Sequence, residues 1–474
     1  MAELNLGAAA PELFLFLGGC ALLLLATTRL SGRLLLHGAN LILAGAALLL
    51  WLAWPAEIGA AFSGLYEVSA LTAMLQMGIL LATIGALSYS GDYLAQRGML
   101  TGEYLALGLF AATGMLLLAA ARHLLALYLG LELMSLSLYA MIALRRDDVR
   151  AIEAALKYFV LGAIASGLLL YGISLVYAAT LQLELPAVAA AAADAEARGV
   201  LLAGLAFIVA GAAFKLGAAP FHMWLPDVYD GAPTAATMFI GGAPKIAAYA
   251  LAIRLLAGGL EPLVEEWSGL LASLAVASLG VGNVIAIAQT SVKRMLAYSA
   301  ISHMGFLLTG IVAGSEEGYA AAMFYAFVYA LMSIGGFGML ALLSRADAEF
   351  EMLADVKGLA KRNPAAAALT LILMLSMAGI PPLAGFYAKL AVWSAAVGAG
   401  WTWLAVVAGL FSVVGAFYYL RVVKLMYFDA PDGDAPAVAL RGPYLLLAAA
   451  NGLLIILLGL FPGGLLRACQ LAFG

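Results

Sequence analysis

The feature that most constrains this chain is a succession of apolar runs, each long enough to cross a bilayer, with short polar segments between them. A helix needs roughly 20 apolar residues to span the hydrocarbon core. Charged residues make up only 11% of the 474 residues, against about 25% in soluble domains. We therefore expect an all-α polytopic membrane protein with about fourteen transmembrane helices. The expected spans are 11–28, 34–54, 68–88, 101–121, 123–143, 154–180, 200–225, 233–257, 268–289, 295–313, 318–344, 364–396, 401–427 and 443–467.

Positive charges indicate the orientation, because Lys and Arg concentrate in cytoplasmic loops. If the N-terminus lies outside, the outward ends hold only Arg122, Arg198, Arg254 and Arg467. The inward loops then hold Arg29, Arg33, Arg97, Arg145, Arg146, Arg150, Lys293, Arg294, Arg345, Lys357, Lys361, Arg362, Arg421, Lys424 and Arg441. We expect a multi-pass membrane protein with both termini on the outward side, which is the periplasmic side if the membrane is a bacterial inner membrane. The first span lacks a basic segment before it and is interpreted as an uncleaved anchor.

Five ionisable residues fall inside expected spans, at Glu132, Lys215, Lys245, His303 and Lys389. A charge at the bilayer centre costs about 2.5–3.5 kcal/mol on insertion scales, so such residues are candidates for function. They come from five helices at comparable depth. We therefore expect a row across the membrane plane, and not a pathway that crosses the bilayer at one point.

Other ionisable residues fit a structural interpretation as well as a functional one. Glu153 and Lys157 stand at i, i+4, the spacing of an ordinary helix salt bridge, and Lys157 is near enough to the inward end to reach the interface. His303 has serines beside it and also fits a hydrogen-bonded packing residue. His222 is predicted to be a structural cap or gate, because no HxxxH or HExxH spacing favours a metal ligand.

Two apolar runs are interrupted at matching places. Gly217 and Pro220 break "AFKLGAAPFHMWLPDVYDGAPT", and Pro381 and Pro382 break "LSMAGIPPLAGFYAKL". Proline removes a backbone donor and clashes with the preceding turn. Freed backbone groups are tolerated at membrane depth only beside protein or a water-filled cavity. Such breaks supply polar backbone and room for water beside a lysine, which suits the movement of protons.

The broken spans are the seventh and the twelfth, which predicts two inverted five-helix repeats made of spans 4–8 and 9–13. The chain would then divide into three N-terminal helices, a first repeat, a second repeat and a C-terminal helix. These parts correspond to residues 1–100, 101–257, 258–427 and 428–474.

The two cysteines, Cys20 and Cys469, stand at opposite ends of the chain. They supply no CxxC motif and no cysteine set for an iron–sulfur cluster or a zinc site. We therefore expect no metal and no redox cofactor in this chain. The net charge of −4 is spread over the loops, without the basic patch that nucleic acid requires.

Three blocks of sequence resemble the antiporter-like membrane subunits of respiratory complex I. They are "AAFKLGAAPFHMWLPDVYDGAPTAAT" followed by "GGAPKIAAY", then "SVKRMLAYSAISHMGF", and "MLSMAGIPPLAGFYAKL". The resemblance covers most of the chain from Leu129 to Lys389. "PDVYDGAP", "PKIAAY" and a lysine in place of a glutamate at 389 are most similar to the N-type branch of that family.

The resemblance implies a proton-translocating membrane-arm subunit of NADH:quinone oxidoreductase. It makes Glu132, Lys215, Lys245 and Lys389 the pumping residues and His303 a relay histidine. NADH, FMN, iron–sulfur clusters and quinone would lie in partner subunits. The implied partners are the neighbouring M-type antiporter-like subunit, small membrane subunits and lipids, with no nucleic acid.

The mechanism that the resemblance implies is electrostatic. Burial favours the neutral form of a lysine, whereas a nearby carboxylate favours the charged form. Glu132 opposite Lys215 would hold that lysine protonated, and withdrawal of the carboxylate would release the proton toward Lys245 and His303. Lys389 would be the terminal exchange point.

Two other functions stay open at the level of sequence. The same fold resembles subunits of multisubunit cation/proton antiporters and of membrane-bound hydrogenases, a group in which Na⁺ exchange is an alternative to proton transport. A scaffold with paired buried lysines is the second alternative, but it does not account for two matched broken helices.

Overall fold

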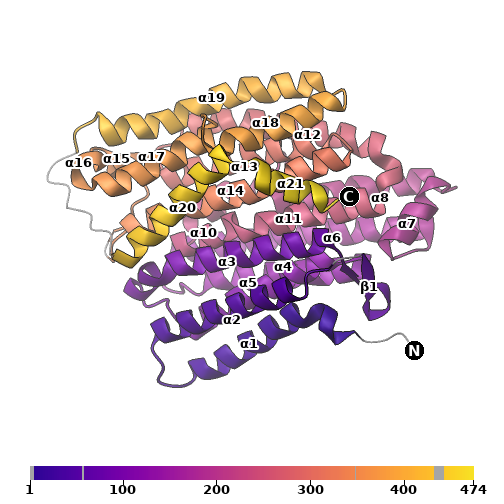
Figure 1. The fold of residues 1–474 in the computed structure, drawn as a ribbon, viewed down its shortest axis with the longest axis horizontal. Helices are drawn as coiled ribbons and strands as arrows, with labels where there is room; N and C mark the ends of the chain where they lie inside the picture. Colours follow the sequence, from indigo (N-terminus) through magenta and orange to yellow (C-terminus); the bar gives the residue numbers. More distant parts are fainter. Residues whose placement is uncertain (1–4, 56–57, 347, 432–441, 474) are drawn as a thin grey trace.

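The computed structural model describes residues 5–55, 58–346, 348–431 and 442–473, and most of them lie in helices that run side by side in one bundle (Figure 1). Within these ranges, twelve helical segments are long and apolar enough to cross a membrane. The expected all-α membrane fold is therefore confirmed. The expected count of fourteen stays a prediction, because α13 and the shorter pair α17–α18 lie outside those twelve.

Ten of the expected spans are single α-helices among the described residues. They are α1 (Ala10–Ala26), α2 (Gly32–Leu52), α3 (Ala70–Gln96), α4 (Gly102–Ala120), α5 (Leu124–Ala143), α6 (Val149–Thr180), α12 (Val264–Ile287), α13 (Val292–Ile311), α14 (Glu316–Leu343) and α19 (Thr402–Tyr427). Several begin at a serine, threonine or aspartate whose side chain accepts from the first turn, as Ser69, Thr101 and Asp148 do. These caps satisfy the N–H groups that a helix start leaves free.

Two spans consist of separate half-helices. The helix α8 (Arg198–Leu216) is followed by α9 (Trp224–Gly231), and α17 (Pro364–Ala378) is followed by α18 (Ala384–Gly398). Both first halves end at a left-handed glycine, Gly217 with φ +82° and Gly379 with φ +84°. Glycine is the residue that adopts this helix-ending conformation without strain.

Two further expected spans are divided, contrary to the sequence prediction of continuous helices. The eighth consists of α10 (Thr234–Gly241), α11 (Ala243–Ile253) and the π-helical turn η3 (Arg254–Gly259). The last consists of α20 (Gly442–Leu460) and α21 (Gly463–Leu471). Each division coincides with a Gly or Pro cluster, and such residues interrupt the helical hydrogen-bond ladder.

Several short elements lie outside the expected spans. At the end of the bundle where α1 begins, β1 (Gly59–Ala61) and β2 (Tyr66–Val68) form an antiparallel hairpin beside α7 (Leu185–Ala193) (Figure 1). At the opposite end lie α15 (Leu353–Val356) and α16 (Leu359–Arg362). The remaining short turns are η1 (Leu6–Ala9), η2 (Phe62–Gly64) and η4 (Glu261–Leu263).

Equivalent helix pairs in the two expected repeats pack through glycines. In the pair α4/α5, a Cβ on Gly114 would lie 2.5 Å from the backbone nitrogen of Met134. In the pair α12/α13, a Cβ on Gly282 would lie 2.5 Å from the backbone nitrogen of Ser302. Small residues allow this close backbone approach between membrane helices. The similarity supports the pairing of spans 4–8 with spans 9–13, which stays a proposal.

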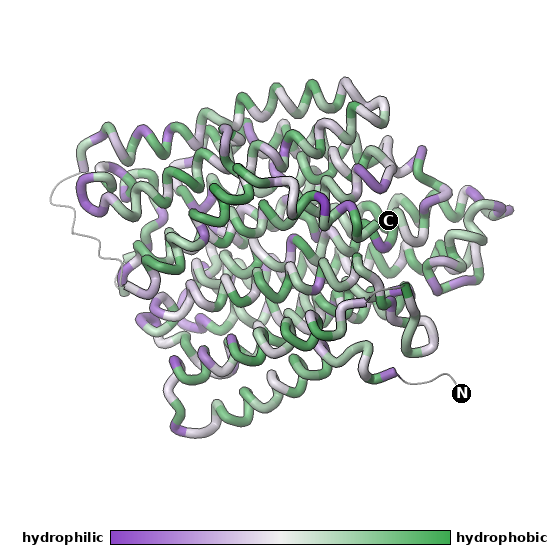
Figure 2. Tube along the Cα trace, viewed as in Figure 1, coloured by the Kyte–Doolittle hydropathy of each residue, from purple (hydrophilic) through white to green (hydrophobic). Residues whose placement is uncertain are grey.

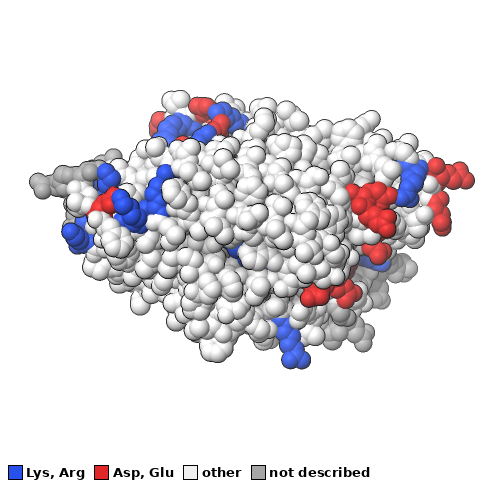
Figure 3. All heavy atoms as spheres, turned by 90° about the horizontal axis from the view of Figure 1, so that it is seen from above, with Lys and Arg blue, Asp and Glu red and all other residues white. Residues whose placement is uncertain are grey.

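The surface separates into an apolar belt and two charged ends. Hydrophobic residues dominate along the helices (Figure 2), and on the face in Figure 3 Asp and Glu gather on the right while Lys and Arg gather on the left. The right end is the one at which α1 begins and α21 ends (Figure 1). This distribution agrees with an inward left end under the positive-inside rule.

Candidate functional site

Glu132 is half-buried on α5, where the hydroxyl of Ser166 on α6 donates to its Oε1 at 2.5 Å. Leu125, Leu129 and Leu136 are exposed on the same helix face. The spacing of these residues puts the carboxylate at the edge of the bundle. Glu132 is thus open to influence from whatever covers this face.

Lys215 lies in the last turn of α8 and is 7% exposed. Its Nζ donates to the hydroxyl of Ser135 on α5 at 2.9 Å. Ser135 follows Glu132 by one helical turn, so both charged groups meet the same face of α5. Within the described residues no ion pair joins them directly. The expected pair is therefore connected through α5 and its serine.

Lys245 is a fully buried residue of α11. Its Nζ donates to the carbonyl oxygen of Leu216 at 2.6 Å and lies 5.4 Å from the centre of the Trp224 ring. Leu216 is the last residue of α8, so its carbonyl is one of those that the helix leaves unpaired at its end. The break in the seventh span therefore supplies the hydrogen-bond acceptor for a buried lysine.

Lys389 repeats this arrangement in the second half of the chain. Its Nζ donates to the carbonyl oxygen of Ala378 at 2.9 Å, to that of Met377 at 3.2 Å and to the hydroxyl of Ser412 at 2.9 Å. The two carbonyls end α17. Lys245 and Lys389 thus both lie at the negative end of a helix dipole, where a cation is stabilised.

His303 is buried between two tyrosines. Its Nδ1 is 2.6 Å from the hydroxyl of Tyr325 on α14, and its Nε2 is 3.1 Å from the hydroxyl of Tyr419 on α19. Tyr419 is also hydrogen-bonded to Ser299. Both ring nitrogens therefore have an O–H partner, and a proton can enter on one side of the ring and leave on the other.

One face of α14 connects His303 with the surroundings of Lys245. Tyr325 and Tyr329 contact the His303 ring, and Phe337 contacts Tyr229, whose ring centre is 6.0 Å from the Lys245 Nζ. The hydroxyl of Tyr229 is buried and has no hydrogen-bond partner among the described residues. Ordered water commonly satisfies such groups.

The remaining candidates, Glu153, Lys157 and His222, lie outside this row. Lys157 forms ion pairs with Glu153 and with Asp227, both at 2.8 Å, and Arg294 also binds Asp227 at 2.9 Å. This cluster of ion pairs joins α6 to α9 and α13, in keeping with the structural interpretation of Glu153 and Lys157. His222 lies between α8 and α9, and its carbonyl accepts from Leu225 at the start of α9.

The helix breaks are evident from the sequence, whereas most hydroxyl partners of the charged groups are not. Gly217, Pro220, Pro381 and Pro382 all fall between half-helices. Sequence alone does not mark the serine and tyrosine partners as a set. A signal existed in α14, where Tyr325, Tyr329 and Ser333 recur every four residues along an apolar helix and so share one face.

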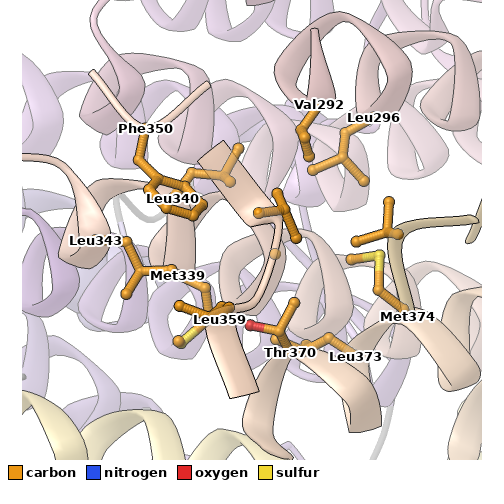
Figure 4. Close-up of a pocket in the computed structure, with 13 residues that line it drawn as sticks. Val292, Leu296, Met339, Leu340, Leu343, Phe350, Leu359, Thr370, Leu373 and Met374 are labelled. Carbon is orange, nitrogen blue, oxygen red and sulfur yellow. The ribbon is translucent and has the colours of Figure 1, made fainter. Parts of the chain in front are cut away.

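A small cavity lies elsewhere, among α13, α14 and α17 (Figure 4). It holds about 20 Å³ and is lined by apolar side chains such as Leu296, Met339 and Leu373. The Thr370 hydroxyl is the one oxygen drawn there, whereas a buried water needs two to four polar partners. This cavity is a packing void. Across the described residues no group of three or more His, Cys, Asp or Glu could hold a metal ion.

Comparison with known proteins identifies the family. Residues 121–415 match the family described as NADH:quinone oxidoreductase/Mrp antiporter, TM. A curated relative from Thiobacillus denitrificans, NADH-quinone oxidoreductase subunit N, is 53% identical over 98% of this chain and 97% of its own length. The protein of the same name from Laribacter hongkongensis is 52% identical over 99% and 97%.

Two solved structures share the fold. A chain of the respiratory complex I from Thermus thermophilus with bound aureothin has a TM-score of 0.82 and 33% identity over 98% of this chain and 100% of that chain. A chain of the Mrp complex from Dietzia has a TM-score of 0.86 over 99% and 97%, and at 20% identity it shows the fold alone.

Proposed function

Since the chain belongs to the NADH:quinone oxidoreductase/Mrp antiporter family, we propose that it is a proton-translocating membrane-arm subunit of an NADH:quinone oxidoreductase. The relatives of about half identity that span nearly its whole length carry the subunit N name. They favour this function over that of a cation/proton antiporter or hydrogenase subunit. Fold similarity to the Mrp complex does not distinguish these alternatives.

One observation supports the relay most directly: each of its five ionisable groups has a polar partner at membrane depth. Glu132 and Lys215 bind serines, Lys245 and Lys389 bind carbonyls at broken helix ends, and His303 binds tyrosines. A buried charge requires such partners. A protein with a purely structural role would not need Lys245 and Lys389 at the ends of broken helices.

The geometry suggests how the relay works. Glu132 lies at the edge of the bundle, so a charge in an adjacent subunit can attract or release it. Lys215 touches the same helix through Ser135. When the carboxylate moves away, the buried ammonium loses electrostatic support and gives up its proton toward Lys245. From there the tyrosines of α14 and His303 lead to Lys389.

The cofactors, partners and localisation that we propose are those expected for a member of this family. We place NADH, FMN, the iron–sulfur clusters and quinone in partner subunits and no cofactor in this chain. The partners are other membrane-arm subunits, including the M-type neighbour, and lipids. The protein lies in the inner membrane with both termini on the periplasmic side. The proposed division into 1–100, 101–257, 258–427 and 428–474 follows the two repeats.

Co-purification tests the function. A tagged chain isolated from its native membrane should bring with it subunits that carry flavin and iron–sulfur centres, together with NADH-driven quinone reduction. Recovery of a set of small cation-antiporter subunits, without flavin or iron–sulfur signals, would contradict the proposal and favour the alternative.

Gly217→Ala is expected to destabilise the chain and to impair proton transport. An L-residue at this left-handed φ costs about 1–2 kcal/mol, and the added Cβ would lie 2.4 Å from Leu225 Cδ1 and 3.3 Å from Lys245 Nζ. The measurement is thermal unfolding of the purified complex together with proton uptake in vesicles. Gly167→Ala on α6, where a Cβ meets nothing within 4 Å, is the control. Equal melting of the two variants would contradict the explanation.

Tyr419→Phe is expected to slow proton transport about tenfold or more, because it removes the hydroxyl that faces His303 Nε2 and Ser299. His303→Ala should slow it further. Tyr89→Phe is the control, since the Tyr89 hydroxyl donates to the carbonyl oxygen of Leu447, away from the proposed row. Proton uptake per NADH oxidised is measured in inverted vesicles. The relay role of Tyr419 is wrong if both phenylalanine variants pump alike.

A further inference from the structure

A large apolar cavity lies at the outward end of the bundle, between α1, β2, α4 and α5. Its volume is about 480 Å³, within the range of roughly 300–1,000 Å³ that is typical of ligand pockets. The walls include Leu13, Phe16, Leu65, Leu117, Leu129 and Leu133. Hydrocarbon is the chemistry that such walls favour.

A buried carboxylate interrupts this apolar wall. Glu12 lines the cavity and is 3% exposed. Its Oε1 accepts from the Tyr66 hydroxyl at 2.8 Å and from Gln76 Nε2 at 2.6 Å. Its Oε2 is buried and has no hydrogen-bond partner among the described residues. An unsatisfied buried carboxylate is costly, so this oxygen calls for a donor that the described residues do not supply.

The position of Glu12 fits the level of lipid headgroups. It lies in the first turn of α1, which begins at Ala10, next to the hairpin at the outward end. The leucines on α4 and α5 continue the cavity wall along the membrane-spanning helices. A ligand that fills this space therefore needs a hydrogen-bond donor at one end and a hydrocarbon chain behind it.

We propose that this cavity binds a phospholipid with a primary ammonium headgroup, namely phosphatidylethanolamine. The ammonium donates to Glu12, and an acyl chain lies along Phe16, Leu117 and Leu129. A primary ammonium has three N–H donors, whereas the quaternary ammonium of phosphatidylcholine has none. The site uses none of the five relay residues. Leu129 belongs to the α5 face that carries Glu132, so the proposal places the acyl chain beside the contact with an adjacent subunit.

Photo-crosslinking tests the site in the intact complex. The complex that contains this chain is placed in phosphatidylcholine nanodiscs doped with a phosphatidylethanolamine probe that has a diazirine in its acyl chain. A phosphatidylcholine probe with the same chains is used in parallel. Labelled peptides are mapped by mass spectrometry. We expect labelling of α1, α4 and α5 wall residues to be about tenfold stronger with the ethanolamine probe, the factor that one charge-assisted hydrogen bond supplies.

Three variants make the result specific. Glu12→Gln should lower labelling by the ethanolamine probe to the level of the choline probe. Ala126→Phe narrows the cavity without changing Glu12 and should reduce labelling by both probes. Glu265→Gln, an exposed carboxylate at the same end, should change nothing. Equal labelling by the two probes would overturn the proposal, and so would unchanged labelling in Glu12→Gln. Absence of labelling because a neighbouring subunit covers the wall residues would also overturn it.

Discussion

Glu132→Gln is expected to reduce coupled proton transport by about a hundredfold, the lower end of the effect of positioned proton-transfer groups. The substitution keeps the size of the side chain and a hydrogen-bonding group for Ser166. It removes the only negative charge in the proposed row. Without that charge the buried Lys215 ammonium loses the support that keeps it protonated.

The measurement separates proton transport from electron entry. Proton uptake and quinone-linked NADH oxidation are followed in inverted vesicles, and both should fall. Electron transfer from NADH to an artificial acceptor should survive, since we assign that chemistry to partner subunits. Glu132→Asp keeps the charge with a shorter reach and should retain part of the activity.

Two controls guard against a structural explanation. Glu103→Gln changes an exposed carboxylate in the first turn of α4 and should be neutral. Blue-native gels establish whether each variant complex is assembled, because a broken buried pair can also destabilise a bundle. A fully assembled Glu132→Gln complex that pumps at the normal rate and stoichiometry would refute the switch.

The helices of this fold are largely predictable from its sequence. In lipid the backbone must satisfy itself, so apolar length alone determines where most helices lie. The interruptions at Gly217 and Pro381 were equally predictable, because glycine and proline interrupt a helix through local effects on the backbone. The division at Gly242 was not predicted, because a single glycine in an apolar helix is common and its effect depends on packing.

The site was predictable in its charged members and not in their partners. A lysine inside an apolar run is rare and therefore informative. Serines and tyrosines such as Ser135 and Tyr419 are ordinary in membrane helices, and only tertiary packing decides which of them meets a charge. The same limit applies to Glu12, which stands near the start of the first span and acquires its cavity from α4 and α5.

Packing also explains why Lys245 and Lys389 have similar surroundings although their sequence positions differ. Lys245 comes from α11 and reaches the end of α8, whereas Lys389 belongs to α18 and reaches the end of α17 in its own broken span. Sequence spacing could not show that both end at a helix C-terminus. The common element is the break, which exposes carbonyls at membrane depth.

Lys389→Met is expected to abolish most proton transport, with a fall of about a hundredfold, because it removes the last titratable group of the row. Methionine keeps the length and apolar stem, so packing against Phe306 should be largely retained. The carbonyls of Met377 and Ala378 lose their donor. We also expect lower stability, by about 1–3 kcal/mol for unsatisfied buried acceptors.

Lys389→Arg distinguishes charge from geometry. It keeps the positive charge, but a Cβ added at Gly379 would lie only 2.9 Å from Lys389 Cδ, so little room exists for a larger planar group. We expect it to pump poorly as well. Lys424→Met, at an exposed ion pair with Asp429, is the control and should pump normally.

Proton uptake with a pH-sensitive dye and melting of the purified complex decide between two roles for Lys389. If Lys389→Met melts lower yet pumps normally at a temperature where it is folded, the lysine only caps α17. If the folded Lys389→Met complex does not pump and Lys389→Arg does not pump either, the site requires a titratable group with the length and shape of lysine. The position of the ammonium, held by two helix-end carbonyls and Ser412, would then be as important to function as its charge.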